Sequence, residues 1–104
     1  MTFFFRADSP RTQASPGRFD RTKGVVGTRQ GDTTVLLDVN GGMYYTLNEV
    51  GGRIWELLGD GVAVPGIIER LQEEYDVPLG RLDADVRSLI DRLQATKLIE
   101  PARR

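Results

Sequence analysis

The spacing of apolar residues changes once along this chain, at Asn48, and that change constrains the fold more than any other feature. Before Asn48, residues 24–47 are rich in β-branched and aromatic residues and are divided by glycine-containing turns, which is typical of β-strands. After it, apolar residues recur every three or four positions as far as Leu93, which is the period of an amphipathic helix. The chain is therefore expected to form a sheet first and a bundle of helices second.

Turn residues divide the first part into three expected strands. Gly31-Asp32 separates a strand over 25–29 from a stronger one over 33–39, which is rich in β-branched residues. Asn40-Gly41-Gly42 then provides a tight turn, because glycine adopts positive φ at little cost. The third strand, 43–47, places its odd-numbered residues on one face and its even-numbered residues on the other. The pattern predicts a three-stranded antiparallel meander.

The second part divides into three helices. Asn48 is expected to cap the first helix, and Gly59-Asp60-Gly61 to end it. The second helix is expected to start near Pro65 and the third near Asp83. Leu98-Ile99 is expected to fold back and complete the core. The order βββααα predicts an α+β fold like a winged helix-turn-helix, with a three-stranded antiparallel sheet packed on three helices.

Two consecutive glycines, Gly51-Gly52, lie inside the first expected helix. Each costs about 1 kcal/mol relative to alanine in a helix interior. The cost is explained if the helix packs closely on the sheet at this point, because a side chain would hold the two elements apart.

The two ends of the chain differ in composition from the region between them. Residues 1–23 contain scattered Ser, Pro, Gln and Arg without a sustained apolar period. We therefore expect a flexible or extended tail over 1–23, one domain over 24–100 and a short C-terminal tail over 101–104. Phe3-Phe4-Phe5 is the apolar exception in the tail, and it suggests either a short anchoring strand or a docking handle for a partner protein.

The composition argues against an enzyme. The chain contains neither cysteine nor histidine, so it lacks a thiolate nucleophile, the usual general base and the commonest metal ligand. Asp83 and Asp85 point in different directions from the start of an expected helix, and Glu73, Glu74 and Asp76 form a solvated helix end. We expect no catalytic residue, no metal site and no cofactor.

The distribution of charge argues against nucleic acid as a partner. The formal net charge is −1, with five basic and two acidic side chains in residues 1–23 and nine basic and thirteen acidic in the remainder. The third expected helix with its end, residues 82–97, carries equal numbers of basic and acidic side chains, so it has no basic face for DNA. A winged-helix DNA-binding regulator stays as the alternative from a different class.

The sequence also predicts that the protein does not enter a membrane. No apolar run approaches the roughly 20 residues that a transmembrane helix needs. The first residues lack the basic region and the apolar core of a secretory signal. A cytoplasmic location is expected.

The third expected strand has an edge that is open to pairing. It contains neither proline nor lysine, and it carries the aromatic pair Tyr44-Tyr45. Such an edge can accept an extended peptide as a further strand. The alternative is that Tyr44 is an ordinary surface tyrosine.

Several stretches, in their order and spacing, resemble the PqqD-like family of peptide-recognition elements. They are Val35-Leu36-Leu37-Asp38, Gly42-Met43-Tyr44-Tyr45-Thr46-Leu47-Asn48 and Gly51-Gly52-Arg53-Ile54-Trp55-Glu56-Leu57-Leu58, continued by residues 67–77 and 85–99. The resemblance covers about residues 24–100. It implies a protein that binds the leader segment of a ribosomally synthesised precursor peptide (a RiPP recognition element) and delivers it to a separate maturation enzyme. The free-standing chain is most similar to the leader-binding proteins of lasso-peptide biosynthesis, which partner a leader peptidase. The alternative within the family is the chaperone of the pyrroloquinoline-quinone (PQQ) precursor.

The resemblance also implies where the peptide binds. The leader would pair as an additional strand with the third strand and lie in a groove formed with the third helix. The implied peptide-binding residues are Met43, Tyr44, Tyr45 and Thr46 on the strand, and Val86, Arg87, Ile90, Leu93 and Lys97 on the helix and its end. Helical spacing alone leaves open whether Val86, Ile90 and Leu93 face the groove or the core.

Overall fold

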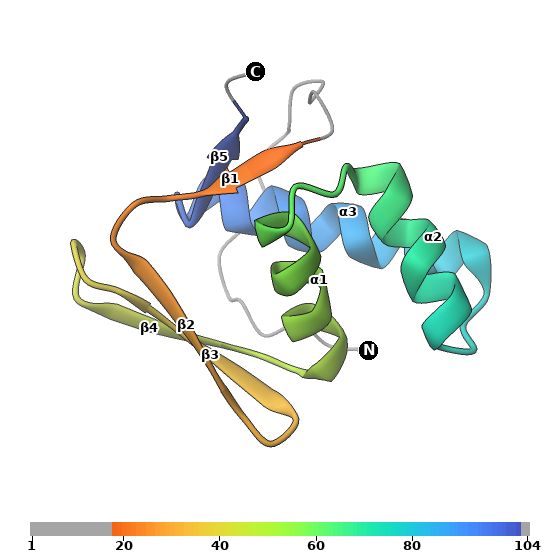
Figure 1. The fold of residues 1–104 in the computed structure, drawn as a ribbon, viewed down its shortest axis with the longest axis horizontal. Coiled ribbons are helices and arrows are strands. Elements are labelled where there is room, and N and C mark those ends of the chain that lie inside the picture. The colour runs from red at the N-terminus through yellow and green to blue at the C-terminus, as the bar shows by residue number, and fades with distance from the viewer. Residues whose placement is uncertain (1–17, 103–104) are drawn as a thin grey trace.

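The computed structural model describes residues 18–102, which form two small sheets and three helices (Figure 1). In chain order the elements are β1 (Phe19–Arg21), β2 (Val25–Gln30), β3 (Thr33–Asp38), β4 (Met43–Leu47), α1 (Glu49–Gly59), α2 (Val64–Glu74), α3 (Leu79–Ala95) and β5 (Ile99–Pro101). Strands β2, β3 and β4 form an antiparallel sheet in that order, and β1 pairs with β5 in a second sheet. The expected α+β class is confirmed.

The three-stranded sheet follows the predicted alternation of side chains. Leu36 lies opposite Tyr45 in the register between β3 and β4. Leu36 and Leu47 are buried, whereas Tyr44 and Thr46 are exposed. The tight turns depend on glycine, since Gly31 and Gly42 both have positive φ.

Helix α1 begins and ends close to its predicted positions, and α2 begins close to its predicted start. The side chain of Asn48 caps α1 by accepting a hydrogen bond from the N–H of Gly51 at 2.8 Å. Helix α2 begins at Val64 with Pro65 in its first turn, where the missing N–H of proline has no helical partner to lose.

The predicted start of α3 near Asp83 is wrong, because the helix begins at Leu79, directly after Pro78. The N–H of Leu82 already donates to the carbonyl of Pro78 at 3.0 Å, and Leu82 is buried in the core. Asp83 accepts from the side chain of Arg87 instead of capping the helix. Helix α3 therefore starts without a capping side chain, and of its first four residues only Leu82 is buried.

The expected boundary between tail and domain needs correction, since β1 lies inside residues 1–23. Phe19 is 1% exposed and belongs to the core. It lies opposite Pro101 in the register of β1 with β5, so the expected C-terminal tail also contributes to the fold. Phe3-Phe4-Phe5 and the rest of residues 1–17 lie outside the described residues, as do residues 103–104.

Helix α1 packs closely on the sheet, as the paired glycines predict. A Cβ atom at Gly52 would lie 3.2 Å from the Cβ of Thr34 and would collide with its hydroxyl. The helix also buries Ile54, Trp55 and Leu57. All three helices lie on one side of the three-stranded sheet (Figure 1).

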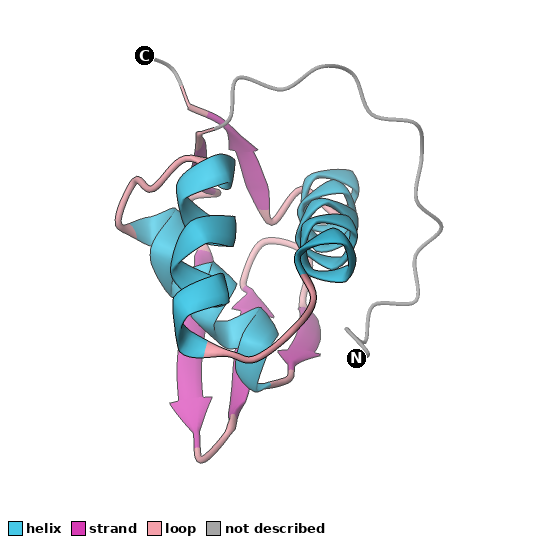
Figure 2. Ribbon diagram, turned by 90° about the vertical axis from the view of Figure 1, so that its right-hand side faces the viewer, coloured by secondary structure: helices cyan, strands magenta, loops and turns pink. Residues whose placement is uncertain are grey.

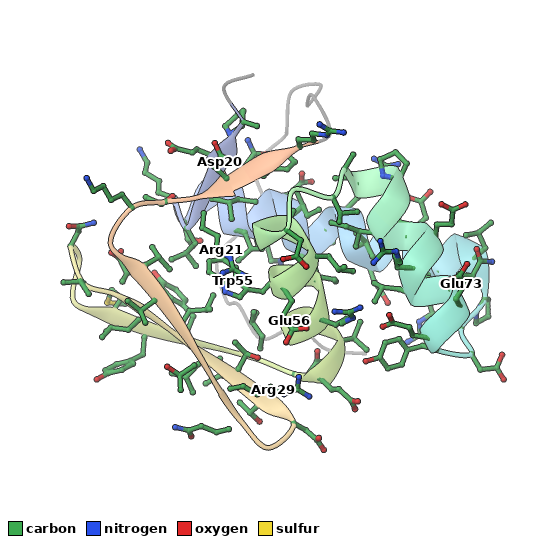
Figure 3. All side chains as sticks on the ribbon, viewed as in Figure 1. Asp20, Arg21, Arg29, Trp55, Glu56 and Glu73 are labelled. Carbon is green, nitrogen blue, oxygen red and sulfur yellow. The ribbon has the colours of Figure 1, made fainter. Side chains whose placement is uncertain are left out.

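Arginine side chains hold the surrounding elements to α1. The guanidinium of Arg21 lies 4.6 Å from the centre of the Trp55 ring, and it donates to the Trp55 carbonyl at 2.7 Å (Figure 3). Partial burial lowers the pKa of Arg21, and the nearby Asp60 and Glu56 oppose that effect. This contact fixes β1 against α1.

A bidentate ion pair joins α1 to α2. Arg53 donates to both carboxylate oxygens of Glu74 at 2.9 Å, and a further bond of 3.0 Å links Arg53 to Glu56. The hydrogen bonds from Arg53 lower the pKa of the Glu74 carboxyl and raise the pKa of Arg53.

Within the described part of the chain, no helix has the length and apolar character needed to cross a membrane.

The burial of Phe19 predicts that β1 contributes to stability. Phe19→Ala is expected to lower the free energy of unfolding by about 3 kcal/mol, because it leaves a cavity beneath β1 and β5. Urea unfolding measures the change, with the exposed neighbour Asp20→Ala as the matched control. Equal stability of Phe19→Ala and the wild type would show that the fold does not depend on β1.

The Arg53–Glu74 pair predicts a dependence of stability on pH. The folded state lowers the pKa of Glu74 below its ordinary value of 4.5, so the pair stabilises the fold above that pH and the contribution is lost as the pH falls through the folded pKa. At neutral pH, Glu74→Gln is expected to cost about 1 kcal/mol or less, because both side chains are partly exposed. Denaturant unfolding at neutral pH and at about pH 3 should show the two proteins converging in acid. A difference that stays constant with pH would contradict this assignment.

Candidate peptide-binding site

The backbone of β3 alternates between its two neighbouring strands. The N–H of Val39 donates to the carbonyl of Gly24 at 2.9 Å, which extends the ladder between β2 and β3 by one step. In an antiparallel sheet, residues that exchange hydrogen bonds with one neighbour alternate with residues that face the other. The odd-numbered residues of β3 therefore bond to β2, and the even-numbered residues bond to β4.

The same alternation fixes the direction of every backbone group in β4. Leu36 is opposite Tyr45, so the odd-numbered residues of β4 bond to β3. The N–H and C=O groups of Tyr44 and Thr46 then point away from β3. Among residues 18–102 no strand pairs with this side of β4. We call it the open edge of β4.

The side chains of β4 differ strongly in exposure. Met43 is 52% exposed and Tyr44 is 69% exposed, and Thr46 is also exposed. Tyr45 is half-buried and packs against the core. A strand added at the open edge would find Met43 and Tyr45 on the side that faces the helices, and Tyr44 and Thr46 on the opposite side.

The structure places three of the five implied helix residues in the core. Val86 and Leu93 are 0% exposed and Ile90 is 4% exposed. Their side chains pack inward on α3, so they are not available as direct peptide contacts in this conformation. The question that helical spacing left open is answered for these residues.

Arg87 is exposed and remains available at the surface of α3. Its Nε donates to the carboxylate of Asp83, one turn earlier on the same helix. Both side chains of the pair are exposed, so the ion pair contributes little to stability. The guanidinium of Arg87 can therefore leave Asp83 and bind another acidic group.

Lys97 ends α3. Its φ is +63°, in the left-handed region that favours glycine. The N–H of Leu98 donates to the carbonyl of Leu93 at 2.9 Å, and the N–H of Lys97 donates to the carbonyl of Gln94 at 3.0 Å. These two bonds form a Schellman motif, which turns the chain from α3 into β5.

A shallow pocket of about 300 Å³ lies beside this turn. Lys97 and Gln94 line it together with Thr22 and residues 99–101. The Oε1 atom of Gln94 is buried, and no described residue donates to it. Lys97 therefore belongs to the end of α3 near β5, whereas Arg87 lies more than two turns earlier on the helix. No local sequence pattern indicates this pocket, because its residues come from both ends of the domain.

Figure 2 shows the helices and strands from a second direction, turned by 90° from the view of Figure 1. Helix α3 packs against α2 and β5, and α1 packs against β3 and β4.

The surface of α3 does not have the charge of a DNA-reading helix. It contains three arginines and three aspartates. Arg81 and Arg87 each form an ion pair with an aspartate four positions away. A recognition helix needs cations directed at phosphates and base edges, so this face does not favour DNA.

Acidic residues do not gather into a metal site within residues 18–102.

Comparison with known proteins places these features in context. A family model described as coenzyme PQQ synthesis protein D (PqqD) matches residues 33–99. The solved structure of TbiB1 in complex with the TbiA(beta) leader peptide is 30% identical, with a TM-score of 0.74, over 82% of this chain and 99% of that chain. The structure of lasso peptide synthetase B1 complexed with the leader peptide is 25% identical, with a TM-score of 0.74, over 81% of this chain and 99% of that chain. The search among curated proteins found no match.

The backbone at Lys97 predicts an unusual stabilising substitution. Lys97→Gly is expected to raise the free energy of unfolding by about 0.5–1 kcal/mol, because glycine adopts the left-handed conformation without steric cost. Lys97→Val is the matched control and should be destabilising, since a β-branched side chain tolerates positive φ poorly. Thermal unfolding of the three proteins checks the order, and a glycine variant less stable than the wild type would contradict it.

Proposed function

Because this chain belongs to the PqqD family, we propose that it is a non-catalytic protein that binds the leader segment of a ribosomally synthesised precursor peptide and delivers it to a maturation enzyme. The biosynthetic class is that of the lasso peptides, and the enzyme is a leader peptidase. The observation that carries the proposal is that both solved structures matched over about four fifths of the chain are complexes with a leader peptide.

The open edge of β4 supports strand addition as the mode of binding. Tyr44 and Thr46 direct two N–H and two C=O groups at an incoming strand. Met43 and Tyr45 would contact alternate peptide side chains on the side of the helices. Arg87 and the lysine at position 97 would provide charged contacts from α3 and its end.

Backbone pairing alone gives weak binding. Four hydrogen bonds at a net of about 0.5–1.5 kcal/mol each amount to roughly 2–6 kcal/mol, which corresponds to about millimolar affinity in the middle of that range. Selectivity and tighter binding must therefore come from side chains beside the edge. The exposed thioether of Met43 and the ring of Tyr45 are the apolar groups in that position.

Delivery needs no chemistry from this chain. A leader held beside an enzyme raises the effective concentration of the attached precursor at the active site, to the millimolar range for a short flexible connection. For this role the protein needs only to hold part of the leader as a strand and to leave the rest of the precursor free to reach the enzyme.

A second candidate within the same family is a chaperone of the PQQ precursor peptide. The two candidates differ in the peptide that binds. Titration of the protein with fluorescent lasso-type leader, PQQ precursor and duplex DNA separates them from each other and from a DNA-binding regulator. Saturable binding of the lasso leader with little salt dependence is expected, whereas DNA binding with a steep salt slope would overturn the proposal.

The open edge predicts the effect of a proline at position 44. Tyr44→Pro removes an N–H that points away from β3, so the sheet should stay intact while peptide affinity falls about tenfold or more. Fluorescence anisotropy with the labelled leader measures the affinity, and circular dichroism checks the fold.

Two further variants make this result specific. Tyr44→Ala keeps the N–H and removes only the ring, so it should retain more affinity than Tyr44→Pro. Tyr45→Pro removes an N–H directed at β3, so it should destabilise the fold itself. Unchanged affinity in a folded Tyr44→Pro protein would exclude strand addition at β4.

A further inference from the structure

The three-stranded sheet has a second face that no described helix covers. The inner face packs on α1, with Leu36 and Leu47 buried and Arg29 reaching Glu56 of α1 at 3.3 Å (Figure 3). Side chains alternate along each strand, so the remaining residues point to the opposite side. We call this side the outer face. Its members are Val26, Thr28 and Gln30 on β2, Thr33, Val35 and Leu37 on β3, and Tyr44 and Thr46 on β4.

An apolar row crosses the outer face. Val26 lies opposite Leu37, and Leu37 lies opposite Tyr44, so the three side chains stand side by side on three strands. Val26 is 52% exposed and Tyr44 is 69% exposed. Neither Leu37 nor its neighbour Val35 packs against the core. In Figure 1 the three helices all lie on the other side of the sheet.

None of the eight residues of the outer face is charged, although charged residues make up 28% of the chain. Exposed surfaces ordinarily mix both signs of charge. The central part of a protein–protein interface, by contrast, is depleted in charge and enriched in aromatic and apolar side chains. The outer face has the composition of an interface.

We propose that the outer face is the docking surface for the maturation enzyme, and that the bound leader completes it. This inference rests on the proposed function. Tyr44 connects the two sites, because its backbone points to the open edge while its side chain lies on the outer face. A strand added to β4 would place every second side chain beside Tyr44 and widen the surface from three strands to four.

The size of the patch favours an enzyme over a second copy of this chain. Three strands at about 4.8 Å spacing, over six residues of about 3.4 Å each, span roughly 14 Å by 20 Å, or about 300 Å². A stable interface needs about 800 Å² on each partner. Two copies that meet on this face alone fall well short of that value. An enzyme that also contacts the added strand and the precursor beyond it obtains the missing area, so leader and enzyme bind cooperatively.

A charge on β2 tests the proposal without touching the open edge. Val26 lies two strands, or about 10 Å, from β4. Val26→Lys should leave leader affinity within twofold of the wild type. It should weaken association of the protein–leader complex with the purified leader peptidase encoded with the precursor at least tenfold. Thr28→Lys is expected to have the same two effects, on leader affinity and on association with the peptidase. It replaces Val26→Lys in the experiment if that variant does not fold.

Gln72→Lys on the exposed side of α2 is the matched control, since it adds the same charge away from the outer face. It should change neither leader affinity nor enzyme association. Anisotropy with labelled leader and calorimetry with purified peptidase provide the two readouts, and sedimentation gives the oligomeric state.

The outcomes separate the two proposals. Normal leader binding together with enzyme association that the outer-face variants do not change would overturn docking at this face and leave the proposed function intact. A wild-type dimer that Val26→Lys dissociates would show that the occupant is a second copy, which also overturns it. Failure of the wild type to bind the leader would overturn the proposed function, and the docking proposal with it.

Discussion

The close approach of α1 to the three-stranded sheet is the contact on which the rest of the fold depends. It is possible because Gly52 has no side chain to collide with Thr34 of β3. With the helix at that distance, its apolar side chains meet the inner face of the sheet, and its other sides pack against α2 and β1. One helix therefore organises the core, and among residues 18–102 no helix covers the other face of the sheet.

In the part of the chain that the structure describes, helices cover only one face of the three-stranded sheet, and no strand pairs with the outer edge of β4. Natural proteins usually protect an open edge, because an unpaired strand is a template for association. Here β4 is short and ends in a buried residue, yet Tyr44 and Thr46 present unpaired backbone groups among the described residues. The proposed binding of a peptide at this edge would use the same strand pairing that causes aggregation elsewhere. It also explains how a chain without histidine or cysteine can serve a biosynthetic pathway, since selection and delivery of a peptide require no reacting group.

The second sheet holds the ends of the domain together. Lys97 adopts a left-handed conformation at the end of α3, which turns the chain back so that β5 can pair with β1. Phe19 then covers the core from the N-terminal side, and Arg21 fixes the strand against Trp55. The orientation of α3, and hence the position of its exposed residues, is linked through this turn to residues near the start of the domain.

The sequence by itself determined the elements and their faces, because alternation and helical spacing are local properties of the chain. It placed β2, β3 and β4, the Asn48 cap, the close packing at Gly52 and the exposure of Tyr44 correctly. It did not reveal β1, because three residues that pair with β5 about eighty positions later have no local period. Nor could it divide α3 into core and surface, since Val86, Ile90 and Leu93 are apolar whichever way they point. Only the tertiary structure decided which backbone groups of β4 are open and that the uncharged side of the sheet has no helix on it, because both depend on which segments meet in space.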